Sequence, residues 1–228
     1  MKNLNVKNQN GRSMIEMLGV LAIIGVLSVG GIAGYSKAMT KYRINKTIEQ
    51  ITLIAGNIRA FFANQGNYAG LSSSDTGKAI IKKAKLVPDE MLELNTDGTI
   101  KQINNAFGGR VSLSLIGGNK QDFEMYLTNV PQEACIELLT KDWITSSVYA
   151  IFMAVDNSHG DIPLSIGGSG SASDNLNLSY NNCESSSYSG KNGIPVSVKF
   201  VCSSTLPLDT AITWCSSSDN NGFSLLFH

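Results

Sequence analysis

The chain has 228 residues, enough for one globular domain with a hydrophobic core and an extension beyond it. Lysine plus arginine and aspartate plus glutamate each total 18, so the net charge is near zero and no basic tract is present. The composition therefore gives no electrostatic reason to expect binding to nucleic acid, and we expect none.

The first predicted element is an apolar helix. Residues 17–36 contain no charged side chain and are mostly Leu, Ile, Val, Ala, Met and Gly. Twenty helical residues span about 30 Å, the thickness of the hydrocarbon core of a bilayer. The segment is longer than the apolar core of a secretory signal peptide, about 7–15 residues, and basic residues flank it on both sides. We predict a membrane anchor whose orientation the flanking charges leave open.

Glu16 lies at the edge of this segment, between Ile15 and Met17. A carboxylate near the middle of a bilayer costs about 2.5–3.5 kcal/mol, so an acid in that position usually has a partner. Taken alone, a glutamate whose side chain reaches the lipid headgroups is the simpler interpretation.

The residues before Glu16 change this interpretation. A short, polar and basic leader, residues 1–11, ends in Gly11, and Glu16 is the fifth residue after it. This pattern, with the apolar residues to about Ala38, resembles the class III leader and N-terminal helix of type IV pilins. The resemblance implies cleavage between Gly11 and Arg12 by a prepilin peptidase and N-methylation of the freed amine of Arg12. It also implies that Glu16 pairs with that amine in a neighbouring subunit. A buried carboxylate is tolerable when each incoming subunit supplies a cation, and such a pair would fix the axial register.

Two features differ from the family pattern. Arg12 stands where the family more often has an apolar residue, which leaves the efficiency of N-methylation open. The apolar segment also lacks a proline, so the candidate weak points are Gly30, Gly31 and Gly34. Each costs a helix up to about 1 kcal/mol relative to alanine, and each would also allow close approach of another helix.

The helical pattern continues past the apolar segment. Apolar residues recur at alternating steps of four and three and form one stripe: Ile44, Ile48, Ile51, Ala55, Ile58 and Phe62. The sequence Asn64-Gln65-Gly66-Asn67 ends the pattern. We predict one helix over 12–63, with residues 12–36 apolar all round and residues 37–64 amphipathic. The first half suits a membrane and later a filament core, and the second half suits packing on a head domain. A plain anchor followed by a helical linker would show a similar pattern.

The remaining residues, 65–228, predict a globular α+β head built around an antiparallel sheet, with the long helix packed on it. Period-two alternation or a continuous apolar run predicts strands at 111–115, 123–127, 148–155, 194–200 and 223–227. A short helix that includes Leu86 is predicted after Asp75, and a second helix from Pro131 to Trp143. Ser165–Asp174 and Cys183–Asn192 are predicted to be exposed loops.

Four cysteines lie in the C-terminal half: Cys135, Cys183, Cys202 and Cys215. None forms a CxxC pair and the chain has two histidines, so a zinc site is poorly supported. An even number of cysteines beyond a membrane segment favours disulfides over buried free thiols. Sequence alone allows three pairings. Residues 129–139 resemble the helix that opens the disulfide-bounded region of type IVb pilins. This resemblance implies a bridge between Cys135 and Cys215, bounding residues of about 135–215, and leaves Cys183 to pair with Cys202.

No catalytic signature is present in the sequence, and we predict no enzymatic activity, no cofactor and no metal. Oxygen ligands for calcium occur together at Asp156, Asn157, His159 and Asp161, but their spacing is not that of an EF-hand. A solvated turn is the favoured interpretation of these four residues.

The favoured hypothesis is a structural one, a type IVb-like pilus subunit that polymerises with copies of itself after processing. Its predicted partners are a prepilin peptidase, the assembly machinery and, before assembly, the bacterial inner membrane. Its predicted final location is an extracellular filament. A minor pilin or a type II secretion pseudopilin is the alternative within the same class. A membrane-tethered adhesin that never polymerises is the alternative from another class, and an anchored envelope enzyme is the least supported.

Overall fold

The structure is a computed structural model of the whole chain. It describes residues 14–72, 74–116, 121–143, 148–155, 186–189, 195–201, 205–215, 217 and 221–228. Only the backbone is described for residues 116, 149, 150, 152–155, 186–189 and 195–201. The chain divides into two compact units between Tyr42 and Arg43, and we describe each unit by itself.

The first unit consists, in its described part, of the N-terminal portion of helix α1 (Met14–Phe62). The helix is continuous, and the predicted helix over 12–63 is present from its third predicted residue onward. It ends where the sequence predicted, because Gln65 N donates to Phe62 O (2.9 Å) in a turn and Gly66 follows with φ +67°. A positive φ suits glycine, which has no Cβ to clash with the backbone.

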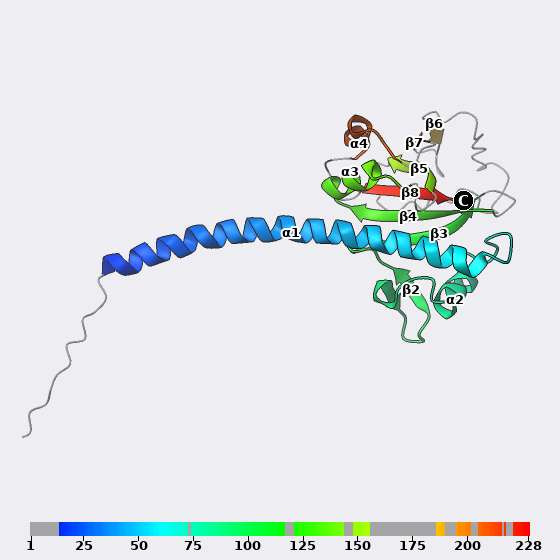
Figure 1. Cartoon of the computed structure of the whole chain (residues 1–228), viewed down its shortest axis with the longest axis horizontal. Helices are drawn as coiled ribbons and strands as arrows, with labels where there is room; N and C mark the ends of the chain where they lie inside the picture. Colours follow the sequence, from blue (N-terminus) through cyan, green and yellow to red (C-terminus); the bar gives the residue numbers. More distant parts are fainter. Residues whose placement is uncertain are drawn as a thin grey trace, which may run out of the picture. The chain divides into compact units, whose positions relative to one another are not determined.

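The second unit is built around a six-stranded antiparallel sheet of order β3-β4-β8-β5-β7-β6 (Figure 1). Its strands are β3 (Val111–Ile116), β4 (Asp122–Val130), β5 (Val148–Val155), β6 (Ser186–Ser189), β7 (Pro195–Val201) and β8 (Asn221–Phe227). A two-stranded sheet contains β1 (Leu92–Leu94) and β2 (Ile100–Ile103). The helices are α2 (Asp75–Lys83), α3 (Gln132–Thr140), α4 (Leu208–Trp214) and a 3-10 turn, Asp89–Met91. The predicted α+β fold, a long helix with an antiparallel sheet, is confirmed.

Alternation of apolar and polar side chains explains the pairing of β3 with β4 at one edge of the large sheet. Leu113 pairs with Met125 and Ser114 with Glu124, so β3 and β4 place apolar residues on one face in register. The last strand, β8, then lies between β4 and β5 and pairs with both. The strand nearest the end of the chain is therefore central in the sheet.

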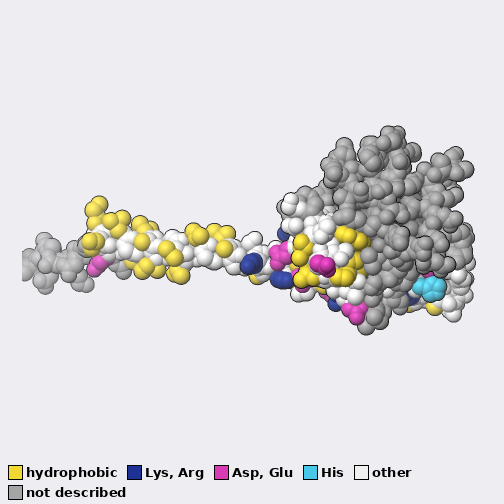
Figure 2. All heavy atoms as spheres, turned by 90° about the horizontal axis from the view of Figure 1, so that it is seen from above, with side chains coloured by type: hydrophobic (Ala, Val, Ile, Leu, Met, Phe, Trp, Pro, Cys, Tyr) yellow, Lys and Arg dark blue, Asp and Glu magenta, His cyan; other side chains and the backbone are white. Residues whose placement is uncertain are grey.

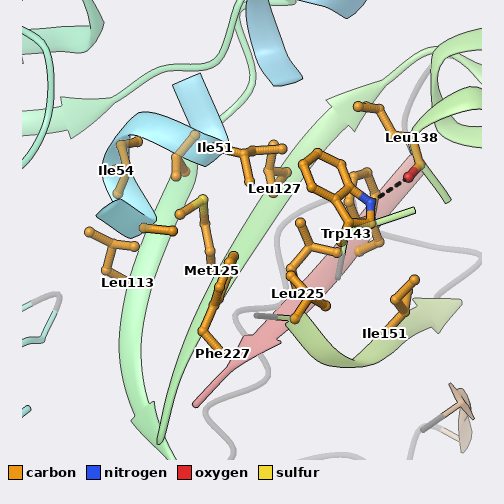
Figure 3. Close-up of a cluster of buried hydrophobic side chains, with 14 of the residues drawn as sticks. Ile51, Ile54, Leu113, Met125, Leu127, Leu138, Trp143, Ile151, Leu225 and Phe227 are labelled. Carbon is orange, nitrogen blue, oxygen red and sulfur yellow. Dashed lines mark hydrogen bonds between the residues drawn. The ribbon is translucent and has the colours of Figure 1, made fainter. Parts of the chain in front are cut away.

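The second half of α1 packs on the apolar face of this sheet. Ile51 and Ile54 lie on the side of α1 that faces Leu113, Met125 and Leu127 (Figure 3), and all five are buried. The predicted stripe is largely correct, although Ile48 is only partly buried and Ile54, which the prediction omitted, is fully buried. The apolar face of α1 is thus wider than the predicted stripe.

A second layer holds α2 and the small sheet. In the view of Figure 1, α2 and β2 lie on the other side of α1 from the six-stranded sheet. Asn57 Nδ2 donates to Leu86 O (3.2 Å), and Lys46 Nζ is 2.8 Å from Glu90 Oε1. Residues 43–62 of α1 therefore contact both layers of the second unit.

Some predicted elements differ from the observed ones. Helix α3 ends at Thr140 because Lys141 has an extended backbone (φ −68°, ψ 140°), so Trp143 lies outside the helix. Its side chain folds back, and Nε1 donates to Leu138 O at 2.8 Å (Figure 3). Helix α2 ends at Lys83, so Leu86 is also outside its predicted helix. The predicted loop Cys183–Asn192 contains strand β6, which pairs with β7, and Ser165–Asp174 lies outside the described residues.

Candidate functional site

The candidate site on the first unit is an apolar helix surface with a single acid. From Met14 to Ser36 the only charged residue is Glu16, which lies in the first turn of α1. An acid there interacts favourably with the positive end of the helix dipole. Every residue from 14 to 38 is exposed, and Figure 2 shows hydrophobic side chains along this part of the helix. Among the residues that the structure describes, none buries this segment.

The exposed side chains in this segment are large. They include Ile15, Leu18, Leu21, Ile23, Ile24, Val26, Leu27, Val29 and Ile32, each at least 52% exposed. Burial of one such side chain contributes about 1.5–3 kcal/mol, so leaving all of them in water would be strongly unfavourable. By its length and composition, helix α1 is long and apolar enough to cross a membrane. Lipid or the helices of other subunits can cover this surface.

Two hydroxyl groups, one in the segment and one just after it, bond to the backbone of their own helix. Ser28 Oγ donates to Ile24 O (2.7 Å), and Thr40 Oγ1 donates to Ser36 O (3.2 Å). Such bonds satisfy a hydroxyl within its own helix, so it does not need water.

The glycines of the segment leave space at its surface. A Cβ added at Gly19, Gly25, Gly30, Gly31 or Gly34 would meet no atom of the described residues within 4 Å. Packing within this chain therefore does not require glycine at these positions. The helix passes unbroken through Gly30–Gly34, the predicted weak points. Small residues on an apolar helix permit close approach of another helix.

The predicted processing site lies outside the described residues. This applies to Gly11 and to Arg12, so cleavage and N-methylation remain predictions. The candidate calcium ligands at 156–161 also lie outside the described residues.

A disulfide closes the C-terminal part of the head. Cys135 of α3 and Cys215 at the end of α4 are bridged, with Sγ atoms 2.00 Å apart and a sequence separation of 80. Both residues are buried, and Gln132 Nε2 donates to Cys215 O at 3.2 Å beside the bridge. This is the pair that the type IVb resemblance implies. Cys183 and Cys202 lie outside the described residues, so their pairing remains a prediction.

Sequence reasoning missed one titratable group in the head. Glu124 on β4 is 1% exposed, and its carboxyl group accepts hydrogen bonds from Ser114 Oγ (2.9 Å) and from Ser224 Oγ. Burial raises the pKa of Glu124 to about 7, although the hydrogen bonds from Ser224 and Ser114 act in the opposite direction. The alternating pattern assigned Glu124 to the polar face of its strand, and no local signal showed that this second face is buried too.

Comparisons with known proteins cover most of the chain. Residues 41–175, more than half of the chain, match the family described as PilS N terminal. The major structural subunit of the bundle-forming pilus of Escherichia coli O111:H- is 26% identical over 159 residues, covering 69% of this chain and 78% of that protein. The same subunit from Escherichia coli O127:H6 matches with the same identity and coverage. Among solved structures, a type IVb pilin from Salmonella typhi matches with a TM-score of 0.49 and 12% identity, covering 81% of this chain and 97% of that one.

Proposed function

This chain belongs to the type IV pilin family described as PilS N terminal, and we infer that it is a structural subunit of a type IVb-like pilus. One observation carries the proposal. A long helix presents an apolar surface that no described residue of the chain covers, while the other half of the same helix contributes to the core of a disulfide-bonded head. Such a subunit can be stored in a membrane and then transferred into a bundle of identical helices.

Two environments cover the apolar surface in turn. Before assembly, the segment spans the inner membrane, where lipid surrounds the side chains from Met14 to Ser36. In the extracellular filament, neighbouring copies of α1 replace the lipid. The van der Waals packing of apolar helices and the space at Gly30 and Gly34 make this exchange feasible at small net cost.

Glu16 sets the register between subunits. A prepilin peptidase cuts after Gly11, and the new amine of Arg12, which is then N-methylated, carries a positive charge. A carboxylate taken into an apolar bundle is strongly destabilising unless a cation meets it. The amine of one subunit therefore pairs with Glu16 of its neighbour, and subunits in other registers leave the acid unpaired.

A pair of isosteric substitutions tests this role. Glu16→Gln removes the charge in the apolar segment, and Glu133→Gln removes the same charge on the exposed surface of α3. We expect sheared surface filaments to disappear with Glu16→Gln and to persist with Glu133→Gln, while both variants are still shortened at the N-terminus. Filaments of normal yield from the Glu16→Gln strain would contradict the register proposal.

The mass of the mature N-terminus tests processing separately. We expect the purified wild-type subunit to begin at Arg12 with a methylated amine. A product that begins at Met1 and never leaves the membrane would support the tethered adhesin instead. Short periplasmic assemblies without surface filaments would support the minor pilin or pseudopilin alternative.

A further inference from the structure

A cleft of about 500 Å³ lies between α2 and the turn that joins β1 to β2. Helix α2 contributes three lysines to its lining, Lys78, Lys82 and Lys83. The opposite wall includes Asn95 and Asp97. The volume is within the range of about 300–1,000 Å³ that is typical of small-molecule sites.

The turn that forms one wall is fixed by its own hydrogen bonds. Asp97 Oδ1 accepts from Thr99 N (2.8 Å) and from Thr99 Oγ1 (2.6 Å), and Asn95 Nδ2 donates to Thr99 Oγ1 (2.9 Å). Gly98 has φ +79°, a conformation that favours glycine. Lys82 Nζ donates to Gly98 O and so joins α2 to the turn across the cleft. The wall is therefore ordered before any ligand binds.

Three lysines and two aspartates, Asp75 and Asp97, line the cleft, so its positive charge is only partly neutralised. Hydrogen bonds from Thr99 hold the pKa of Asp97 below its usual value, and this anion faces Lys82. Glu90 and Glu93 do not line the cleft and are paired with lysines outside it, Glu90 with Lys46 (2.8 Å) and Glu93 with Lys101 (2.6 Å). Within the part of the chain that the structure describes, Lys78 and Lys83 have no carboxylate within 4.0 Å, and Lys78 Nζ donates one long hydrogen bond to Lys101 O (3.4 Å).

We propose that this cleft binds a small hydroxylated anion, a sugar that carries a carboxylate or a phosphate. The ammonium groups of Lys78 and Lys83 are placed to bind the acidic group. The carboxylate of Asp75 and the amide of Asn95 also line the cleft and supply hydrogen-bonding partners for sugar hydroxyls. This binding activity goes beyond the structural role of the subunit, because filament assembly needs only the helix and the fold of the head.

The acidic sugar has two possible sources, and different probes distinguish them. Carboxylated sugars occur in surface glycans, whereas phosphorylated sugars occur in lipid headgroups. The full chain in detergent micelles is titrated with glucuronic acid and with glucose 6-phosphate, and glucose and inorganic phosphate serve as controls. We expect one acidic sugar to bind at least ten-fold more tightly than either control, and the preferred sugar identifies the source.

Matched double variants locate the binding. Lys78→Gln with Lys83→Gln removes two charges from the cleft, and Lys37→Gln with Lys85→Gln removes two exposed charges outside its lining. We expect the first pair to raise the Kd at least ten-fold and the second to change it less than two-fold, with unchanged circular dichroism for both. We expect the cleft variants to give a normal filament yield. A failure of the cleft proposal is therefore distinguishable from a failure of the pilus proposal.

Several results would overturn the cleft proposal. These are equal effects of the two double variants, binding of glucose as tight as that of its acidic derivatives, and binding of phosphate as tight as that of glucose 6-phosphate. Failure of both acidic sugars to bind would also overturn the proposal. Self-association that depends on Lys78 and Lys83 and is insensitive to sugars would instead assign the cleft to the acidic surface of a second copy.

Discussion

Ser114 on β3 donates a hydrogen bond of 2.9 Å to the buried carboxyl group of Glu124 on β4, within a paired position of the two strands. The pair joins a polar hydroxyl to an acid whose pKa burial raises to about 7. Between pH 4.5 and about pH 7, the folded head therefore keeps a proton on Glu124 that the unfolded chain has already released.

The first prediction concerns the pH dependence of stability. The unfolded pKa of Glu124 is 4.5 and the folded pKa is about 7, so the folded state binds more protons between these values. The contribution of protonated Glu124 to the free energy of unfolding is fully present below pH 4.5 and is lost as the pH rises through 7. The lost stability is on the order of 3 kcal/mol at 1.36 kcal/mol per pKa unit.

Thermal unfolding of the full chain in detergent at pH 4.5 and pH 8 measures this effect. We expect Glu124→Gln to be more stable than the wild type at pH 8 and similar to it at pH 4.5. Exposed acids whose pKa values are lowered, such as Glu90 and Glu93, are present in both proteins, so their effects cancel in the difference. A difference between the two proteins that does not vary with pH would contradict the prediction.

The second prediction concerns the disulfide. Closure of a loop of 80 residues between Cys135 and Cys215 stabilises the folded state by about 4 kcal/mol in the chain-entropy model. We expect the double variant Cys135→Ser, Cys215→Ser to unfold at a temperature lower by about 8–16 °C, at 2–4 °C per kcal/mol. Reductant should lower the midpoint of the wild type toward that of the variant. A wild-type midpoint that is insensitive to reductant would count against this bridge.

The third prediction compares two neighbouring residues of α1. Ile54 is fully buried against the sheet, whereas Leu53 is 47% exposed. We expect Ile54→Ala to destabilise the head by about 2–5 kcal/mol, because it removes buried methyl groups and leaves a cavity. Leu53→Ala should cost less than about 1 kcal/mol. The two thermal midpoints give the comparison, and equal losses would show that the helix packs in another orientation.

The fourth prediction compares two glycines. A Cβ at Gly109 would lie 1.9 Å from the carbonyl oxygen of Thr128, whereas a Cβ at Gly56 would meet nothing within 4 Å. We expect Gly109→Ala to destabilise the head by about 1–3 kcal/mol through overpacking. Gly56→Ala should stabilise it by about 0.5–1 kcal/mol, because alanine loses less backbone entropy in a helix. Opposite shifts of the thermal midpoint would verify both predictions, and a stable Gly109→Ala protein would contradict the first.

The sequence predicted elements that have a strong local period. The apolar run and the stripe from Ile44 to Phe62 predicted the long helix, and the alternation around Leu113 and Met125 predicted two strands whose register the structure then supplies. Burial on one face produces these patterns directly, so they can be recognised without tertiary information.

Short elements without a period escaped prediction. Strand β1 has three residues and α4 has seven, and tertiary contacts hold both, including the disulfide at Cys215. Strand β6 (Ser186–Ser189) has the composition of a loop, and its pairing with β7 decides its conformation. The burial of Glu124 was unpredictable for the same reason, since it depends on what covers the second face of β4.

The order of strands also constrains when the head can fold. Strand β8 separates β4 from β5, so β3–β4 and β5–β7–β6 have no shared neighbour until residues 221–227 join them. A ribosome must therefore synthesise almost the entire chain before the large sheet can close. If residues 17–36 insert into a bilayer as proposed, they are available for insertion well before that point, and the head would complete its folding while tethered. Nascent chains arrested before Asn221 should accordingly remain sensitive to protease throughout the sheet.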